Sequence, residues 1–369
     1  MRTQSILIAS LALSLGMGAF TPLRVAAQAQ PAPTTPSPAN ALQLYELFKR
    51  GKALIDANKY DAALPIYQQA LQLDPKNARI YSAIGFIHAQ KGSFPEAAQA
   101  YRQAIALEGR DPNFYYALAF CLANLNDYDN ASEAYKRVLQ LDPKRIDAYE
   151  GLAVIYSRQR NYSGALKLYQ KIVEVDPKNA NAFRALGILA LQQQQTREAI
   201  AALQKAAELA PKNGEVRVGL AYAYLAQGDA EGATAAVNQA MALEPRNAKV
   251  NVRAGNVLLS QGSLDEALEA YRRATNADGK LPDGYIGVGD VLRAKGDSLG
   301  ALVAYRQAIQ NQPQNPIAHH RAGLALQDRN RREEAIASFK TAKQLYLSQG
   351  QGQSEDYRKL SALLQRLGG

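Results

Sequence analysis

Apolar and small residues recur along this chain with a period of 34 residues. If position 1 is set at Leu44, nine repeats follow one another without insertion or deletion, and they start at Leu44, Ala78, Pro112, Ile146, Ala180, Gly214, Ala248, Pro282 and Pro316. Positions 4, 7, 8 and 11 of a repeat share one face of a helix, and positions 20, 24, 27 and 28 share one face of a second. The pattern therefore predicts nine helix–turn–helix units.

Three positions indicate how the two helices of a unit pack. Position 20 is Ala in every repeat, position 8 is Gly or Ala, and position 24 is a large apolar residue, mostly Tyr. Small residues at positions 8 and 20 let the two backbones approach closely, and the ring at position 24 fills the space beside that contact. Gly at position 15 in four repeats suits the turn between the helices, and Pro at position 32 in six repeats ends the second helix. One such hairpin cannot bury its own apolar face, so the pattern predicts a stacked array.

These positions resemble the tetratricopeptide repeat family, of an exported bacterial type, from residue 44 to about residue 345. The resemblance implies an all-α, right-handed superhelical solenoid whose first helices line an inner groove where protein segments bind. The departures are mild, since position 4 holds Arg217, Asn251 and His319 where the family prefers a large apolar residue. After the repeats, Tyr357, Leu360 and Leu364 recur at helical spacing, which predicts a capping helix within residues 350–369, so that the repeats occupy 44–349.

The first 29 residues have the layout of a secretory signal peptide. Arg2 precedes an uncharged stretch from residue 6 to residue 20, and small residues at cleavage-type spacing follow, so we expect cleavage after Ala27 or Ala29. The alternative is an uncleaved membrane anchor. Residues 30–43 contain four prolines and are predicted to form an extended linker. We therefore expect an exported protein, periplasmic, lumenal or secreted, with an N-terminally anchored protein as the alternative.

Composition and motifs argue against catalysis, cofactors and nucleic acid. The net charge is +10, but no run of Lys and Arg exceeds two residues, so no nucleic-acid footprint is predicted. Cys121 is the single cysteine and takes an apolar position of its repeat, so neither a disulfide nor a nucleophile is expected. His319 and His320 point about 100° apart on a helix, which is unsuited to a shared metal ion. The glycines at 287 and 289 lack the third glycine of a dinucleotide loop.

The resemblance assigns the inner groove to positions 2, 5, 9 and 12 of each first helix. The predicted partner-binding residues at these positions are Tyr45, Phe48, Phe86, Tyr116, Phe120, Val154, Ile188 and Tyr222. Repeats seven to nine are more polar there, with Asp290 and Arg293 among the residues. The Lys–Asn pair with which one subgroup of the family grips a C-terminal carboxylate never occurs at positions 5 and 9. Two interpretations stay open, because the aromatic residues either bind partners or are covered by neighbouring repeats or by the linker.

The sequence thus predicts a non-catalytic scaffold that binds other proteins, with no cofactor and no metal. The alternatives are a membrane-tethered assembly factor and a non-catalytic subunit of an envelope enzyme complex. The identity of the partners and the oligomeric state cannot be read from the chain.

Overall fold

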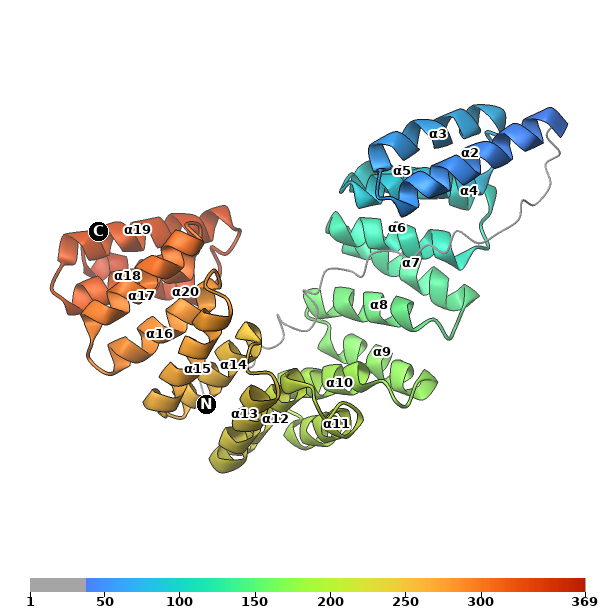
Figure 1. Cartoon of the computed structure of the whole chain (residues 1–369). Coiled ribbons are helices and arrows are strands. Elements are labelled where there is room, and N and C mark those ends of the chain that lie inside the picture. The colour runs from blue at the N-terminus through green and yellow to red at the C-terminus, as the bar shows by residue number, and fades with distance from the viewer. Residues whose placement is uncertain (1–37, 369) are drawn as a thin grey trace. The chain divides into compact units, whose positions relative to one another are not determined.

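The computed structural model describes residues 38–368, and within that range it contains 19 helices and no strand (Figure 1). The predicted signal peptide and residues 30–37 of the predicted linker lie outside the described residues. None of the helices in the described range is both long and apolar enough to cross a membrane. An all-α solenoid is thus the fold, as the 34-residue pattern predicted.

The first helices of repeats two to nine begin at the first residue of each repeat. They are α4 (Ala78–Gln90), α6 (Pro112–Asn124), α8 (Ile146–Arg158), α10 (Ala180–Gln192), α12 (Gly214–Gln227), α14 (Ala248–Ser260), α16 (Pro282–Ala294) and α18 (Pro316–Asp328). The second helices are α3 (Tyr60–Leu73), α5 (Phe94–Leu107), α7 (Tyr128–Leu141), α9 (Tyr162–Val175), α11 (Thr196–Leu209), α13 (Ala230–Leu243), α15 (Leu264–Ala277), α17 (Ser298–Asn311) and α19 (Arg332–Ser348), and α20 (Glu355–Arg366) follows them.

The first repeat differs from the prediction at its N-terminal end. Its first helix, α2 (Pro38–Asp56), begins six residues before Leu44, so residues 38–43 belong to a helix and not to an extended linker. Proline is compatible with this position because its missing N–H would have no partner in the first helical turn. The boundary of the predicted linker at residue 43 is therefore corrected.

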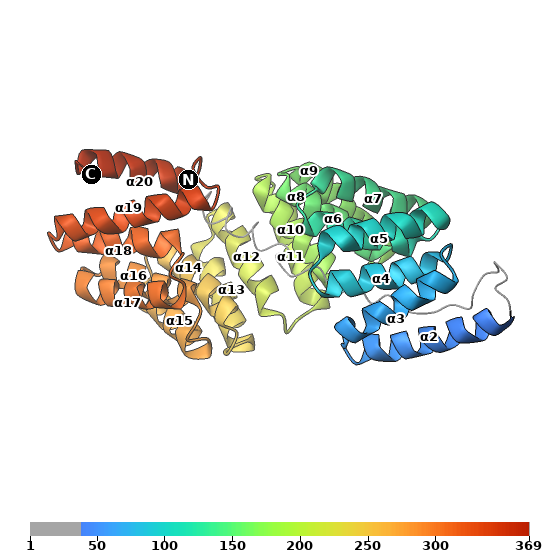
Figure 2. The same cartoon turned by 90° about the horizontal axis from the view of Figure 1, so that it is seen from above.

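The described chain divides into two compact units, which we call the N-terminal unit (38–189) and the C-terminal unit (190–368). Within each unit, the two helices of a hairpin pack against each other, as α4 and α5 or α14 and α15 do, and first helices of neighbouring repeats also pack directly on one another. These contacts join α4, α6 and α8 in the N-terminal unit, and α12, α14, α16 and α18 in the C-terminal unit (Figure 2). Each unit therefore has a face made of packed first helices, formed by α4, α6 and α8 in one and by α12, α14, α16 and α18 in the other.

The core of each hairpin has the predicted design. The Ala at position 20 is fully buried in all nine repeats, and Tyr101, Tyr135, Tyr271, Tyr305 and Phe339 at position 24 are among the largest fully buried side chains. A Cβ atom added to Gly255, at position 8, would lie 2.8 Å from the ring of Tyr271 in the same repeat, and one added to Gly287 would lie 2.2 Å from the same ring. Gly287 is at position 6 of the next repeat, so the ring lies against two successive first helices.

The turn between the two helices of a repeat uses the left-handed backbone conformation at position 15. The value of φ is positive there in all nine repeats, at Asn58, Gly92, Asn126, Arg160, Gln194, Gly228, Gly262, Gly296 and Asn330. Gly adopts this conformation without strain, and Asn tolerates it better than most residues. The same turn therefore forms in every repeat. Its conformational cost is lowest where position 15 is Gly and higher where it is another residue.

Candidate protein-binding face

The first-helix face of the N-terminal unit begins with two of the predicted aromatic residues, on α2. Tyr45 is 62% exposed. Phe48 is half-buried, and its ring contacts Tyr67 of α3 edge to face, with 5.8 Å between the ring centroids. Tyr45 is thus open to a partner, whereas Phe48 presents only part of its ring.

Phe86 and Phe120 are covered partly by the preceding repeat. Both are half-buried at position 9, and each ring contacts the aromatic residue that begins the second helix of the repeat before it. The centroid of Phe86 lies 6.4 Å from that of Tyr60, and the centroid of Phe120 lies 6.0 Å from that of Phe94. Edge-to-face pairs of this kind stabilise packing, so these two rings join neighbouring repeats.

Tyr116 is buried, and the guanidinium group of Arg145 covers its ring. Its ring lies 5.6 Å from that of Tyr135, and the guanidinium carbon of Arg145 lies 4.7 Å from its ring centroid. Arg145 is held in place by Asp147 Oδ1, 2.9 Å from its Nε, and by Asn113 Oδ1, 2.8 Å from its Nη1. The surface above the Tyr116 ring is therefore a fixed guanidinium group with its two polar neighbours.

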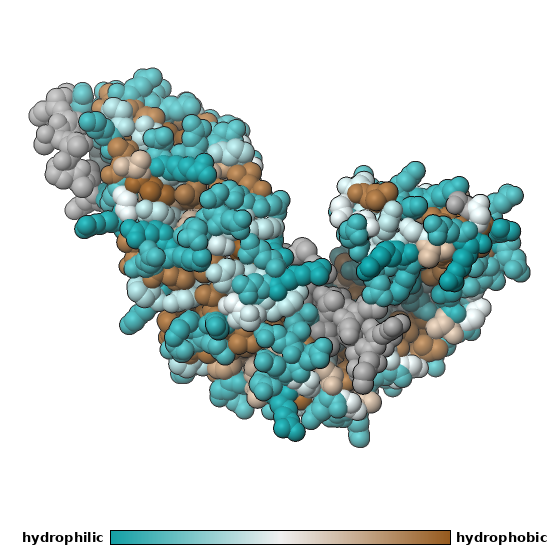
Figure 3. Space-filling view, turned by 180° about the vertical axis from the view of Figure 1, so that it is seen from behind, coloured by the Kyte–Doolittle hydropathy of each residue, from teal (hydrophilic) through white to brown (hydrophobic). Residues whose placement is uncertain are grey.

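The remaining predicted residues lie deeper. Val154 is half-buried, and Ile188 and Tyr222 are each 2% exposed. Burial raises the pKa of the Tyr222 phenol, and the Asn256 side chain opposes this shift. Ile188 and Tyr222 therefore contribute to packing. On the side of the molecule shown in Figure 3, hydrophobic side chains likewise lie in short bands between hydrophilic ones.

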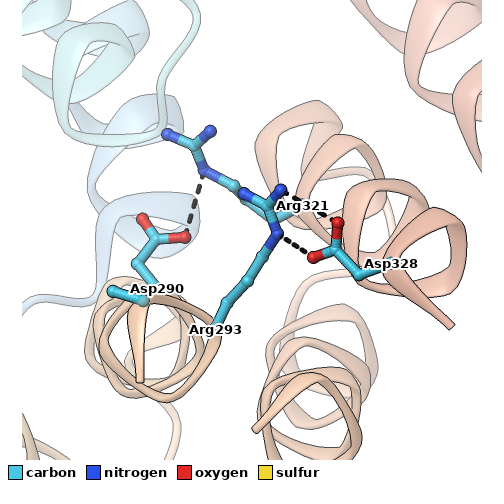
Figure 4. A pocket seen from close by; sticks show the side chains of 5 residues that line it. Asp290, Arg293, Arg321 and Asp328 are labelled. Carbon is cyan, nitrogen blue, oxygen red and sulfur yellow. Dashed lines mark hydrogen bonds and ion pairs between the residues drawn. The ribbon is translucent and has the colours of Figure 1, made fainter. Parts of the chain in front are cut away.

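The first-helix face of the C-terminal unit holds a charged cavity of about 500 Å³. It lies between α16 and α18 and is lined by Asp290, Arg293, Ala294, Arg321 and Asp328 (Figure 4). We call it the charged pocket. Asp290 and Arg293 occupy positions 9 and 12 of the eighth repeat, in the polar part of the predicted groove. Arg321 and Asp328 occupy positions 6 and 13 of the ninth, which the sequence analysis did not assign to the groove.

The two arginines of the charged pocket are held differently. Arg293 donates to both oxygens of Asp328, with Nε 2.5 Å from Oδ2 and Nη2 3.3 Å from Oδ1, and this hydrogen bonding raises the pKa of Arg293. Arg321 Nε lies 3.2 Å from Asp290 Oδ1, but this buried N–H is not aligned for a hydrogen bond with any described residue. Asp290 Oδ1 accepts instead from the Tyr305 hydroxyl, at 2.7 Å. Arg321 is therefore paired by charge alone.

His320 lies beside the charged pocket and is uncharged at neutral pH. Its ring contacts Phe339 edge to face at 5.9 Å between centroids. Burial, followed by the positive charge of Arg321, lowers the pKa of His320 to about 4. Within the described residues, no group of three metal-binding side chains comes together here or elsewhere.

The residue at position 4, including two of the three departures, has a structural role that the sequence analysis did not assign. Tyr149 at this position donates its hydroxyl to the backbone oxygen of Pro143, which is position 32 of the preceding repeat, at 3.1 Å. Asn251 Nδ2 donates to the oxygen of Pro245 at 3.0 Å, and His319 Nε2 lies 2.9 Å from that of Pro313. Three different side chains thus make the same hydrogen bond between repeats.

The fold and this face define an α-helical repeat protein. Models of the tetratricopeptide repeat match residues 51–92 and 289–330, 88–146 and 218–282, and 125–189 and 190–241. Together these matches span most of the chain. The chain belongs to the tetratricopeptide repeat family.

Two solved structures show the same fold, and a third is similar to less than half of the chain. Yeast Tom70 is 14% identical, with a TM-score of 0.53 over 89% of this chain and 96% of its own. A tetratricopeptide repeat protein from Parabacteroides merdae is 19% identical, with a TM-score of 0.54 over 68% of this chain and 99% of its own. MamA from Desulfovibrio magneticus RS-1 is 27% identical, with a TM-score of 0.43 over 46% of this chain and 95% of its own. No curated protein matches the chain.

Proposed function

We propose that the protein is a non-catalytic scaffold that binds segments of other proteins along its first-helix faces. One observation carries the proposal: the first helices of successive repeats pack directly on one another within each unit. Positions 2, 5, 9 and 12 of neighbouring repeats therefore share one surface. Asn113 on α6 and Lys249 on α14, both at position 2, are exposed on it. Tyr45 on α2 and Asn181 on α10 are exposed at the same repeat position.

The side chains of these faces are suited to contact rather than to reaction. In the N-terminal unit a partner meets aromatic edges and the guanidinium group of Arg145, and in the C-terminal unit it meets paired charges. Cys121, the single thiol of the chain, is buried, and burial raises its pKa to about 12. A thiol with this pKa stays protonated at neutral pH and is a poor nucleophile.

For the cellular setting we propose an exported protein whose partners lie in the periplasm or an equivalent compartment. The support is the sequence of the first 29 residues, with its positive start, its uncharged stretch and its small residues at cleavage-type spacing. A membrane-tethered assembly factor, in which this segment is retained, is the alternative. A non-catalytic subunit of an envelope enzyme complex would use the same faces.

Position-specific photo-crosslinking in the native host tests the scaffold proposal without disturbing the core. A photoreactive amino acid would replace Tyr45, Asn113, Asn181 or Lys249 on the first-helix faces. Matched controls would carry it at the exposed positions Arg102, Lys205 and Arg272 on second helices. We expect defined crosslinked adducts from the first set and none from the second. Equal crosslinking from both sets, or none from the first, would contradict the proposal.

A further inference from the structure

The second helix of the eighth repeat, α17, carries an exposed apolar pair on its outer side. Leu299 and Val303 lie four residues apart, so they are neighbours on one face of the helix, and they are 54% and 61% exposed. They occupy positions 18 and 22 of the repeat. Residues at both positions are exposed in all nine repeats, so packing of the repeats does not require apolar side chains there.

The other eight repeats have no large aliphatic residue at either position. Position 18 is Asp61, Pro95, Asp129, Ser163, Arg197, Glu231, Asp265 and Glu333 in these repeats. Position 22 is Pro65, Gln99, Glu133, Lys167, Ala201, Ala235, Glu269 and Ala337. The apolar pair of α17 is therefore a local feature of the eighth repeat, and its two side chains gain free energy when another molecule covers them.

The apolar pair also replaces a polar contact between neighbouring repeats. In three places a side chain at position 14 is paired with Asp at position 18 of the preceding repeat. The pairs are Lys91 Nζ with Asp61 Oδ1 at 2.5 Å, Gln159 Nε2 with Asp129 Oδ1 at 3.2 Å, and Lys295 with Asp265. The corresponding residues of repeats nine and eight are Arg329 and Leu299. Arg329 is exposed and forms no ion pair with any described residue.

The charge beside the apolar pair is positive. Arg306, three residues after Val303, is exposed on the same side of α17 and forms no ion pair within the described part of the chain. The helix contains no acidic residue, and Asp297 before it is the N-cap, whose Oδ1 accepts from Gly300 N at 2.8 Å. The surface thus combines two aliphatic side chains with two cations that have no internal carboxylate partner.

We propose that the outer face of α17 docks an amphipathic helix of a partner protein whose apolar stripe is bordered by acidic residues. Leu299 and Val303 form a ridge along α17, and such a ridge packs between the side chains of a second helix. Acidic residues beside the partner's stripe would meet Arg306 and Arg329 and fix its orientation. The site lies on a second helix, so it goes beyond the binding proposed for the first-helix faces.

The composition of the surface indicates a weak contact rather than a permanent one. A stable interface buries about 800 Å² on each partner, which two aliphatic side chains do not provide. Exposed ion pairs contribute little and are screened by salt. We therefore expect the apolar pair to determine the affinity, and the two arginines to determine the preference for an acidic partner over a basic one.

The test uses three amidated helical peptides with the same neutral dye and the same alanine-rich backbone. The first carries a leucine stripe bordered by Glu, the second has the same stripe bordered by Lys, and the third keeps Glu but has Gln in place of leucine. Fluorescence anisotropy with the full mature chain at low salt measures their binding. We expect the first peptide to bind about tenfold more tightly than either of the others.

Substitutions to residue types that other repeats carry at these positions test the site without disturbing the core. Leu299→Asp combined with Val303→Glu should weaken binding of the first peptide about tenfold. The matched control, Ser163→Asp with Ala235→Glu, introduces the same charges at positions 18 and 22 of two other repeats and should leave binding unchanged. Arg306→Glu should abolish the preference for Glu over Lys.

Equal binding of the three peptides to the wild-type protein would overturn the proposal, and so would wild-type affinity in the doubly substituted α17 variant. If that variant melts early, the preference measured with Arg306→Glu decides. Peptide binding at α17 without crosslinks from the first-helix faces would sustain this proposal and refute the scaffold proposal. Crosslinks without peptide binding would do the reverse.

Two further measurements identify other occupants of the outer face of α17. Sedimentation velocity detects a dimer, and cosedimentation with phosphatidylglycerol vesicles detects binding to an anionic membrane. We expect the wild-type protein and the doubly substituted α17 variant to behave alike in both. A dimer or a vesicle complex that the double substitution abolishes would assign the surface to a second copy of the chain or to a membrane, and would overturn the proposal.

Discussion

At the scale of single residues, the tyrosine hydroxyl group at position 24 forms a hydrogen bond in some of the described repeats but not in others. The hydroxyl groups of Tyr101 and Tyr135 are buried and find no hydrogen-bond partner in the described range, because position 9 of their repeats is Phe86 and Phe120. The hydroxyl groups of Tyr271 and Tyr305 donate to Asn256 and Asp290, each at 2.7 Å. The sequence distinguishes these cases only once position 9 is known to contact position 24.

This difference predicts opposite effects for one substitution. Tyr135→Phe removes a buried hydroxyl without a partner, so we expect stability to be unchanged or raised by about 1 kcal/mol. Tyr305→Phe removes the donor to Asp290 and should lower the free energy of unfolding by about 1 kcal/mol. Chemical denaturation of the two variants, read by circular dichroism, measures the contrast. A similar loss in both would show that the hydroxyl group of Tyr135 is satisfied in solution.

The left-handed residue at position 15 gives a second prediction. Arg160 has φ of 59°, which is unfavourable for a side chain of this kind, whereas Gly228 with φ of 89° is not strained. Arg160→Gly should raise the free energy of unfolding by about 1 kcal/mol, and Gly228→Ala should lower it by a similar amount. Thermal melts of both variants check the sign. An earlier melt for Arg160→Gly would mean that its side chain contributes more than the turn costs.

At the scale of the helices, the hairpin depends on the small residue at position 20. Ala165 is fully buried on α9, as are its eight counterparts. Ala165→Leu should overpack the contact with α8 and lower stability by about 1–3 kcal/mol. Lys167→Leu is the matched control, since Lys167 is exposed on the same helix and should tolerate the change. A thermal melt with no difference between Ala165→Leu and the wild-type protein would place the helix contact elsewhere.

The 34-residue pattern determined the helices but not which aromatic residues would remain exposed. Helical spacing placed Phe86 and Phe120 on the face of the first helices. Whether they are open depends on Tyr60 and Phe94, which come from the second helix of the preceding repeat. Such a contact between repeats is not encoded in the periodicity of one helix. The charged pocket escaped prediction for the same reason, because Arg321 and Asp290 belong to different repeats.

At the scale of the whole chain, the outer face of α2 and the helix α20 show two ways of ending an array. Positions 3 and 6 of the first repeat are the exposed Glu46 and Lys49, whereas position 3 is buried in the other repeats. At the other end, Leu360 and Leu364 of α20 are buried against the last repeat, in one cluster with Tyr346. Polar residues cover the first end and an additional helix covers the second, as repeat arrays require.

The proposed export gives a prediction on the mature N-terminus. If the first residues are a cleaved signal, protein purified from its native host begins at Gln28 or Gln30. Edman sequencing, or mass spectrometry of the N-terminal peptide, identifies the first residue. Retention of Met1 or Arg2 would instead favour the membrane-tethered alternative.

The helix α20 gives the last prediction, which tests whether stability in this array is local. Leu360 and Leu364 are 0% and 3% exposed, and they pack with Phe339 and Tyr346 of α19. Replacing both leucines with alanine should cost about 2–5 kcal/mol for each one, which exceeds what a single terminal repeat can supply from its own packing. Because each repeat contacts only its neighbours, we expect amide exchange to accelerate in α18 and α19 while α4 to α8 stay protected. Gln365→Ala, on the exposed side of α20, should leave all of these helices unchanged. Equal acceleration along the whole chain would mean that the repeats unfold as one cooperative body, and no acceleration in α19 would mean that α20 does not cap the array.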